Sequence, residues 1–215
     1  MKKLLMIVLL TVVGTTGFKS FQTVRNSVNF VRARQWVPMG ASLAELQRNA
    51  TILETEGAKI VERLVSDVDE INVAETAKET SSAFEACCRE LEQLKSLRDL
   101  AESQLKTWRT EGERELEDWK VRIDEMSVNL RLNEQRKLTA EQAEFRLLLT
   151  DFASSIVEMN SVIKQGRDIE LLNASFAHAA NLAAMREGVA GLNKEVKSKT
   201  AAFKSTLDRA LASFR

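Results

Sequence analysis

The stretch LEQLKSLRDLAESQLKTW, residues 91–108, places its apolar side chains three, four or seven positions apart. Such spacing puts these side chains on one side of an α-helix, with charged and polar residues between them. The repeat averages close to 3.5 residues, which is the heptad pattern of helices that pack lengthwise against a partner. This stretch therefore predicts a long amphipathic helix with an apolar seam.

The composition extends this prediction to the rest of the chain. The 215 residues include one proline and eight glycines, so residues that favour turns are scarce. Charged residues make up 29%, and most of the remainder are good helix formers. Similar apolar seams recur over residues 43–71, 116–130, 145–163 and 189–214. We predict an all-α fold, either an antiparallel coiled-coil hairpin or an elongated helical bundle behind an N-terminal membrane segment.

Polar interruptions divide the seams into two arms, residues 42–136 and 139–215. A bend near residues 133–139 would join the arms into a hairpin. Further breaks near residues 73–82, at Gly166 and at Gly188 would instead give a shorter three- or four-helix bundle. Periodicity alone leaves both arrangements open.

Helix starts are indicated by capping boxes, in which a Ser or Thr is followed three residues later by Glu or Gln. The sequence contains four such pairs near the expected breaks: Ser42 with Glu45, Thr76 with Glu79, Ser82 with Glu85, and Thr139 with Gln142. We expect the first arm to begin at Ser42, after the break at Pro38 and Gly40.

Residues 1–18 combine two lysines with an apolar run from Leu4 to Gly14. This pattern is typical of a signal peptide, but no Ala-x-Ala cleavage site follows it. The run is also short for a membrane span. We predict a retained signal-anchor, and a cleaved signal remains the alternative. The layout resembles that of bacterial proteins with an N-terminal membrane segment and a long coiled coil. The expected location is the bacterial inner membrane, single-pass with the bulk outside the cytoplasm; after cleavage the protein would be periplasmic or secreted.

Residues 19–41 form a basic amphipathic segment that ends in a Pro/Gly break. Residues 1–44 hold six basic residues and no acidic one. A basic amphipathic helix with aromatic residues suits the membrane interface. The predicted lipid-contacting residues are Lys19, Arg25, Arg32, Arg34 and Trp36. Alternatively, this segment is the first helix of the bundle.

The sequence gives no support for catalysis or for a cofactor. His178 is the single histidine, and it lies among alanines, where we expect it to pack in a helix seam. No glycine-rich phosphate loop, nucleophile elbow or zinc-ligand spacing is present. We therefore predict no enzyme activity, no cofactor, no metal site and no nucleic-acid binding.

Two features point to partners of the chain. The adjacent Cys87 and Cys88 cannot bridge each other without distorting a helix, and outside the cytoplasm one of them could form an intermolecular disulfide. An apolar stripe on the first arm must be shielded from water by packing against a partner, and it therefore predicts a homo-oligomer. Its residues are Leu91, Leu94, Leu105, Trp108, Leu116, Trp119, Ile123 and Met126. The expected function is a membrane-tethered structural or scaffolding coiled coil; the alternative is an exported helical binding or chaperone-like protein.

Overall fold

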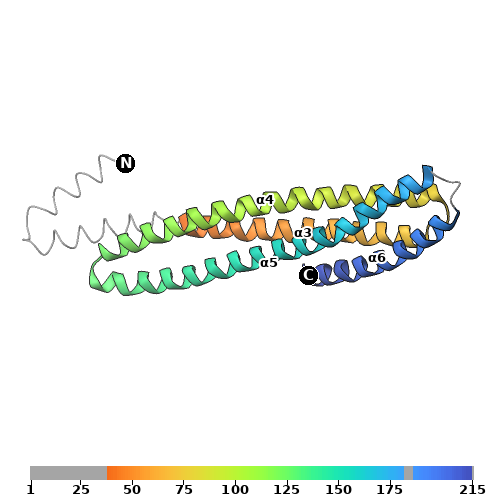
Figure 1. Ribbon diagram of the computed structural model, residues 1–215. Helices are drawn as coiled ribbons and strands as arrows, with labels where there is room; N and C mark the ends of the chain where they lie inside the picture. The colour runs from red at the N-terminus through yellow and green to blue at the C-terminus, as the bar shows by residue number, and fades with distance from the viewer. Residues whose placement is uncertain (1–37, 182–185, 215) are drawn as a thin grey trace, which may run out of the picture. The chain divides into compact units, whose positions relative to one another are not determined.

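The computed structural model describes residues 38–181 and 186–214, which form four α-helices (Figure 1). They are α3 (Pro38–Val73), α4 (Ala77–Asp124), α5 (Val128–Asn181) and α6 (Arg186–Ser213). The described ranges contain no strand, so the prediction of an all-α fold is confirmed.

The predicted membrane segment and most of the basic segment lie outside the described residues. This holds for all five predicted lipid-contacting residues, which are Lys19, Arg25, Arg32, Arg34 and Trp36. Within the ranges that the structure describes, no helix is long and apolar enough to cross a membrane.

The first described helix begins earlier than the sequence predicts. α3 starts at Pro38, whereas the capping box of Ser42 and Glu45 predicts a start at Ser42. Proline fits the first turn of a helix, because its φ is already helical and it has no N–H to leave unpaired. Pro38 therefore opens the helix, and the predicted start at Ser42 is wrong.

The break between α3 and α4 depends on a capping box. The Thr76 N–H donates to Glu79 Oε2 at 3.1 Å, and the Glu79 N–H donates to Thr76 Oγ1 at 3.2 Å. These two bonds satisfy two N–H groups that the first helical turn cannot pair. The box that the sequence predicts at Thr76 is thus the one that starts α4. Ser82, the other predicted start, is exposed inside α4.

The turn between α4 and α5 lies at residues 125–127, not at the predicted 133–139. Residues 133–139 are continuous helix, and most of them face solvent, which explains their polarity. Arg131 stabilises the actual turn: its Nη2 donates to the carbonyl oxygens of Asp124 at 2.5 Å and Met126 at 3.3 Å. The last carbonyl group of α4 and one carbonyl group of the turn thereby gain a donor.

The chain divides into two compact units. Unit 1 contains the described residues 38–45 together with Thr110–Arg146, and unit 2 contains Leu46–Arg109 together with Leu147–Arg215. In unit 1, the α4 residues Leu116 and Ile123, the α5 residues Leu138 and Phe145, and Met126 in the turn are buried.

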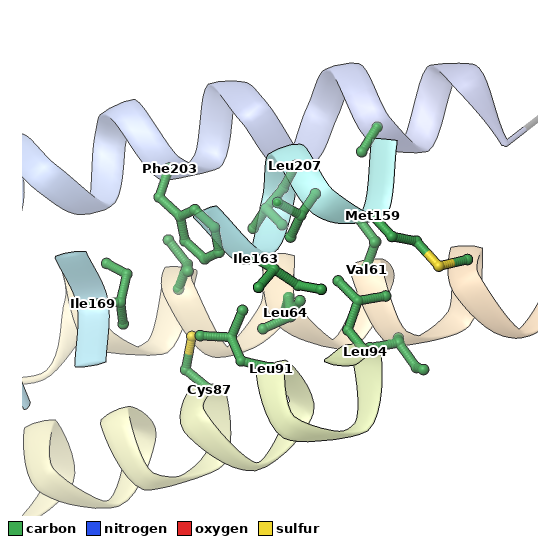
Figure 2. Close-up of a cluster of buried hydrophobic side chains, with 14 of the residues drawn as sticks. Val61, Leu64, Cys87, Leu91, Leu94, Met159, Ile163, Ile169, Phe203 and Leu207 are labelled. Atoms are coloured by element: carbon green, nitrogen blue, oxygen red, sulfur yellow. The ribbon is translucent and has the colours of Figure 1, made fainter. Parts of the chain in front are cut away.

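Unit 2 has an apolar core to which all four helices contribute (Figure 2). Figure 2 shows side chains from each helix pointing to one centre. They are Val61 and Leu64 from α3, Cys87, Leu91 and Leu94 from α4, Met159, Ile163 and Ile169 from α5, and Phe203 and Leu207 from α6. Burial of such side chains is the main favourable contribution to the stability of the unit.

Gly166 does not end a helix, contrary to the prediction. It lies in the middle of α5, against Leu91 of α4. A Cβ built on Gly166 would lie 2.5 Å from Leu91 Cδ2. The glycine is needed because the leucine side chain fills the space in which its own Cβ would stand.

Candidate functional site

The predicted oligomer stripe is largely buried within the single chain. In unit 2, Leu91 and Leu94 are fully buried and Leu105 packs against the core. The unit 1 members Leu116, Ile123 and Met126 are buried. The two tryptophans of the stripe, Trp108 and Trp119, are half-buried. Self-association through this stripe stays a prediction, and it would require the helices to separate.

The two cysteines occupy different environments in unit 2. Cys87 is fully buried in the core, and burial raises the pKa of its thiol far above the usual value. Cys88 is half-buried, and Asn173 Nδ2 donates to its sulfur at 3.7 Å. Burial also raises the pKa of the Cys88 thiol. An intermolecular disulfide stays a prediction, and Cys88 is the cysteine through which a folded chain would form it.

His178 is exposed on α5, so the expectation that it packs in a helix seam is wrong. It lies on the outer side of the helix, because the neighbouring core position is Phe176. In the part of the chain that the structure describes, no three His, Cys, Asp or Glu side chains gather as metal ligands would.

In unit 2, α6 is joined to its neighbouring helices by pairs of polar side chains. On the α3 side, Lys204 Nζ donates to Asp69 Oδ2 at 2.7 Å. One turn away, the Thr200 hydroxyl donates to Asn72 Oδ1 at 2.6 Å. Thr200 is fully buried, and its hydroxyl also lies 2.7 Å from the Val196 carbonyl oxygen of its own helix, so both Asn72 and the backbone are within its hydrogen-bonding reach.

The α5 side of α6 has two matching pairs. Lys199 Nζ donates to Asp168 Oδ2 at 3.1 Å. The Thr206 hydroxyl is almost completely buried and donates to Gln165 Oε1. Arg209 Nη2 in turn donates to Thr206 Oγ1 at 3.2 Å. The two sides of α6 are therefore fixed to different helices by one ion pair and one buried threonine each.

A hollow of about 590 Å³ lies on the surface between α3 and α6. Its charged lining consists of Asp69 and Asp208 with Lys204 and Arg209. The ion pair of Lys204 with Asp69 forms part of its wall. The lining has both signs of charge and no cysteine or histidine, so its chemistry suits contact with polar groups.

The apolar periodicity of residues 189–214 does not predict these four polar pairs. Thr200 lies four residues after Val196 and is buried, but it is polar and so does not belong to the apolar pattern. The signal was a polar residue at a seam position. Its partner Asn72 lies 128 residues away in sequence, and no local pattern connects the two.

Comparison of the chain with protein-family models, curated proteins and solved structures finds no match.

Proposed function

We propose that this chain is a membrane-tethered structural or scaffolding protein, in which an antiparallel helical bundle mediates self-association or holds a protein partner. The single observation that supports this most is that the residues of the four helices in unit 2 serve to pack the helices against one another. Their inward side chains build a core, and their polar contacts join helix to helix. Packed helices arranged in this way position surfaces for contact with other proteins.

The contact pairs in unit 2 support the antiparallel arrangement. Between α4 and α5, Leu91 approaches Gly166, and Arg98 further along α4 donates to the earlier Asn160 at 2.7 Å. The residue numbers rise along one helix as they fall along the other. The contacts of α6 with α3 and α5 follow the same rule. These pairs are Asp69 with Lys204, Asn72 with Thr200, Gln165 with Thr206, and Asp168 with Lys199. Helices related in this way form up-and-down bundles.

The tether is tested by the fate of residues 1–17. Mass spectrometry of the mature N-terminus and carbonate extraction of membranes measure it directly. We expect the full-length chain to fractionate with membranes and to resist extraction. A soluble product that begins at Phe18 would overturn the tether and favour the exported binding or chaperone-like protein.

Contact of the basic segment with lipid is tested separately on vesicles. We expect the change of Arg25, Arg32 and Arg34 together to Glu to weaken binding of the chain that starts at Phe18 to anionic vesicles. Salt should weaken the parent in the same way, because it screens exposed charges. Equal binding of both forms at low salt would contradict lipid contact by this segment.

Self-association is tested by sedimentation of the full chain in mild detergent. We expect a dimer or a larger species at micromolar concentration. A monomer over the whole accessible range would leave partner binding as the only scaffolding role.

A further inference from the structure

The two flanks of the α4–α5 helix pair in unit 1 differ in exposure. Gly112 of α4 lies against Phe145 of α5, and this contact marks the line along which the two helices meet. Since an α-helix turns by about 100° per residue, the positions on either side of that line follow from the sequence. On one side the residues are half-buried: Glu115 and Trp119 from α4, Leu130 and Glu141 from α5. On the other side they are exposed: Glu113 and Lys120 from α4, Val128 and Gln135 from α5.

Two carboxylates on the half-buried flank each have a buried oxygen atom without a partner. Within the described residues, neither Glu115 Oε2 nor Glu141 Oε2 has a hydrogen-bond partner. The short turn between α4 and α5 makes these helices antiparallel in unit 1. Glu115 follows Gly112 by three residues and Glu141 precedes Phe145 by four, so the two carboxylates lie at one level of the helix pair. A shielded carboxylate without a donor is unfavourable unless a cation joins it.

The bases nearby do not meet this need. Lys137 donates to Glu134 at 2.7 Å. Burial raises the pKa of the Glu141 carboxyl, the charges of Glu144 and Glu134 raise it further, and Lys137 opposes them. Arg122, which α4 places on the same flank, donates to neither of the two buried oxygen atoms. The half-buried flank therefore offers a site for further cationic side chains.

The chain before Pro38 is the nearest segment that could supply them. Residues 38–45, the start of α3, belong to unit 1 together with Thr110–Arg146. Residues 74–76 alone connect α3 to α4, and so short a connection is typical of antiparallel neighbours. Followed backward from Pro38, the chain therefore sets out in the direction in which α4 runs to its turn with α5.

The sequence just before α3 has the matching charge and length. Residues 25–37 contain three arginines and no acidic residue, whereas residues 110–146 contain ten acidic and seven basic residues. At about 1.5 Å per residue, residues 25–37 would span roughly 20 Å as a helix, and α4 spans roughly 15 Å from Glu115 to its end. Val28 and Val31 have helical spacing and give the segment an apolar side.

We propose that residues 25–37 dock along the half-buried flank of unit 1, with their arginines against Glu115 and Glu141 and their valines against Trp119 and Leu130. The arginines are Arg25, Arg32 and Arg34. Arginine suits this role, because it is always charged and can donate two parallel hydrogen bonds to a carboxylate. The inference depends on neither the tether nor the self-association proposed above. Docking and the proposed lipid contact use the same arginines, so the segment makes one of these contacts at a time.

Hydrogen exchange of the full chain in a mild non-ionic detergent, without lipid, tests the docking. We expect the amides of residues 25–37 to exchange at least about tenfold more slowly than those of an unstructured chain. Glu115→Arg with Glu141→Arg should remove this protection, and so should the change of the three arginines to Glu. All five changes together should restore it, because they reverse both charges. Unchanged protection of the unit 2 core shows that each variant is folded.

Glu113→Arg is the matched control, because Glu113 lies two residues from Glu115 but on the exposed flank. It should leave the protection of residues 25–37 unchanged. Four results would overturn the docking: no protection in the wild type, no loss in Glu115→Arg with Glu141→Arg, an equal loss in Glu113→Arg, or no recovery when all five charges are reversed.

Crosslinking shows whether the segment docks on its own chain. The full chain carries Cys87→Ala and Cys88→Ser, so that it has only the thiols introduced for the test. With a short thiol–thiol crosslinker, Arg34→Cys should link to Glu115→Cys within one chain several-fold faster than to Glu113→Cys. Equal rates for the two positions, or links that form only between copies, would overturn the docking within one chain.

Discussion

The ring of Phe145 fills the space beside Gly112 in unit 1, where a Cβ on the glycine would lie 2.1 Å from Phe145 Cζ. Gly166 has the same relationship to Leu91 in unit 2. Glycine inside a helix costs stability relative to alanine. Both glycines therefore persist at positions where the adjacent helix supplies a large side chain in place of their own.

Alanine at these glycines is expected to destabilise the protein, although alanine is the better helix former. We expect Gly112→Ala and Gly166→Ala each to lower the free energy of unfolding by roughly 1–3 kcal/mol, because Phe145 or Leu91 must move from its place. Urea denaturation with a circular-dichroism readout measures the change.

Gly191 provides the matched control for both variants. Apart from its chain neighbours and the backbone of its own helix, no atom lies within 4 Å of a Cβ built on Gly191. We expect Gly191→Ala to leave stability unchanged or to raise it by up to about 1 kcal/mol, as helix propensity alone dictates. If all three variants behaved alike, the close packing at Gly112 and Gly166 would be refuted.

The start of α4 provides a second prediction. Thr76→Ala removes the hydroxyl that accepts the hydrogen bond from the Glu79 N–H. We expect a loss of about 1 kcal/mol in the free energy of unfolding.

The carboxylate of Glu79 accepts hydrogen bonds from two backbone N–H groups, first that of Thr76 and second that of Glu75. These bonds lower the pKa of Glu79 from the usual 4.5. A lowered folded-state pKa gives stability that is present above the unfolded value and is lost as the pH falls. Glu79→Gln should therefore lower the free energy of unfolding at neutral pH, and this loss should vanish in acid.

Ser82→Ala is the control, since Ser82 also begins a capping-box sequence but lies exposed inside α4. We expect no loss there, because alanine is favoured within a helix. An equal loss of free energy of unfolding in Thr76→Ala and Ser82→Ala would show that the capping hydrogen bond does not stabilise the start of α4.

The helical class was predictable because the apolar period is a local property of the sequence. The position of the turn between α4 and α5 was not. The seam continues through Met126, so the pattern gives no sign of the turn at residues 125–127. The polar run at 133–139 resembles a break, although it is a solvent-facing helix surface. The donor that stabilises the true turn, Arg131, belongs to the next helix.

The polar pairs of α6 were unpredictable for a related reason. Asn72, Gln165 and Asp168 are ordinary helix-surface residue types, and only packing brings them to α6. The partners lie between 31 and 135 residues apart in the chain. Helical periodicity assigns a residue to a face of its own helix, but it does not assign the helix that will cover that face.

The reactivity of the two thiols is the third prediction. Cys87 is fully buried, whereas Cys88 is partly accessible beside Asn173. We expect a disulfide reagent to modify Cys88 first and Cys87 only as the protein opens, because the thiolate must form and be reached. Cys87→Ser should keep the faster phase and Cys88→Ser should remove it. A single rate for both thiols in the native protein would contradict the burial of Cys87.

The last prediction concerns Asp67, whose Oδ2 atom is buried and has no hydrogen-bond partner. Burial raises the pKa of this carboxyl above 3.8, and the charges of Glu70 and Glu90 raise it further, against the opposing effect of Arg89 and Arg63. A raised folded-state pKa means that the associated stability is fully present below the unfolded value and is lost as the pH rises through the folded value. At neutral pH the ionised carboxylate therefore destabilises unit 2.

We expect Asp67→Asn to raise the melting temperature at pH 7. The gain in the free energy of unfolding should be less than about 1 kcal/mol, because solvent screens a partly exposed group. The gain should shrink as the pH falls and vanish below the unfolded value of 3.8, where the Asp67 carboxyl is protonated in both states. Asp151→Asn, at an exposed position of α5, serves as the control and should show no such pH-dependent gain. A melting temperature that falls at pH 7 in Asp67→Asn but not in Asp151→Asn would show that the Asp67 charge stabilises the fold, and would refute this prediction.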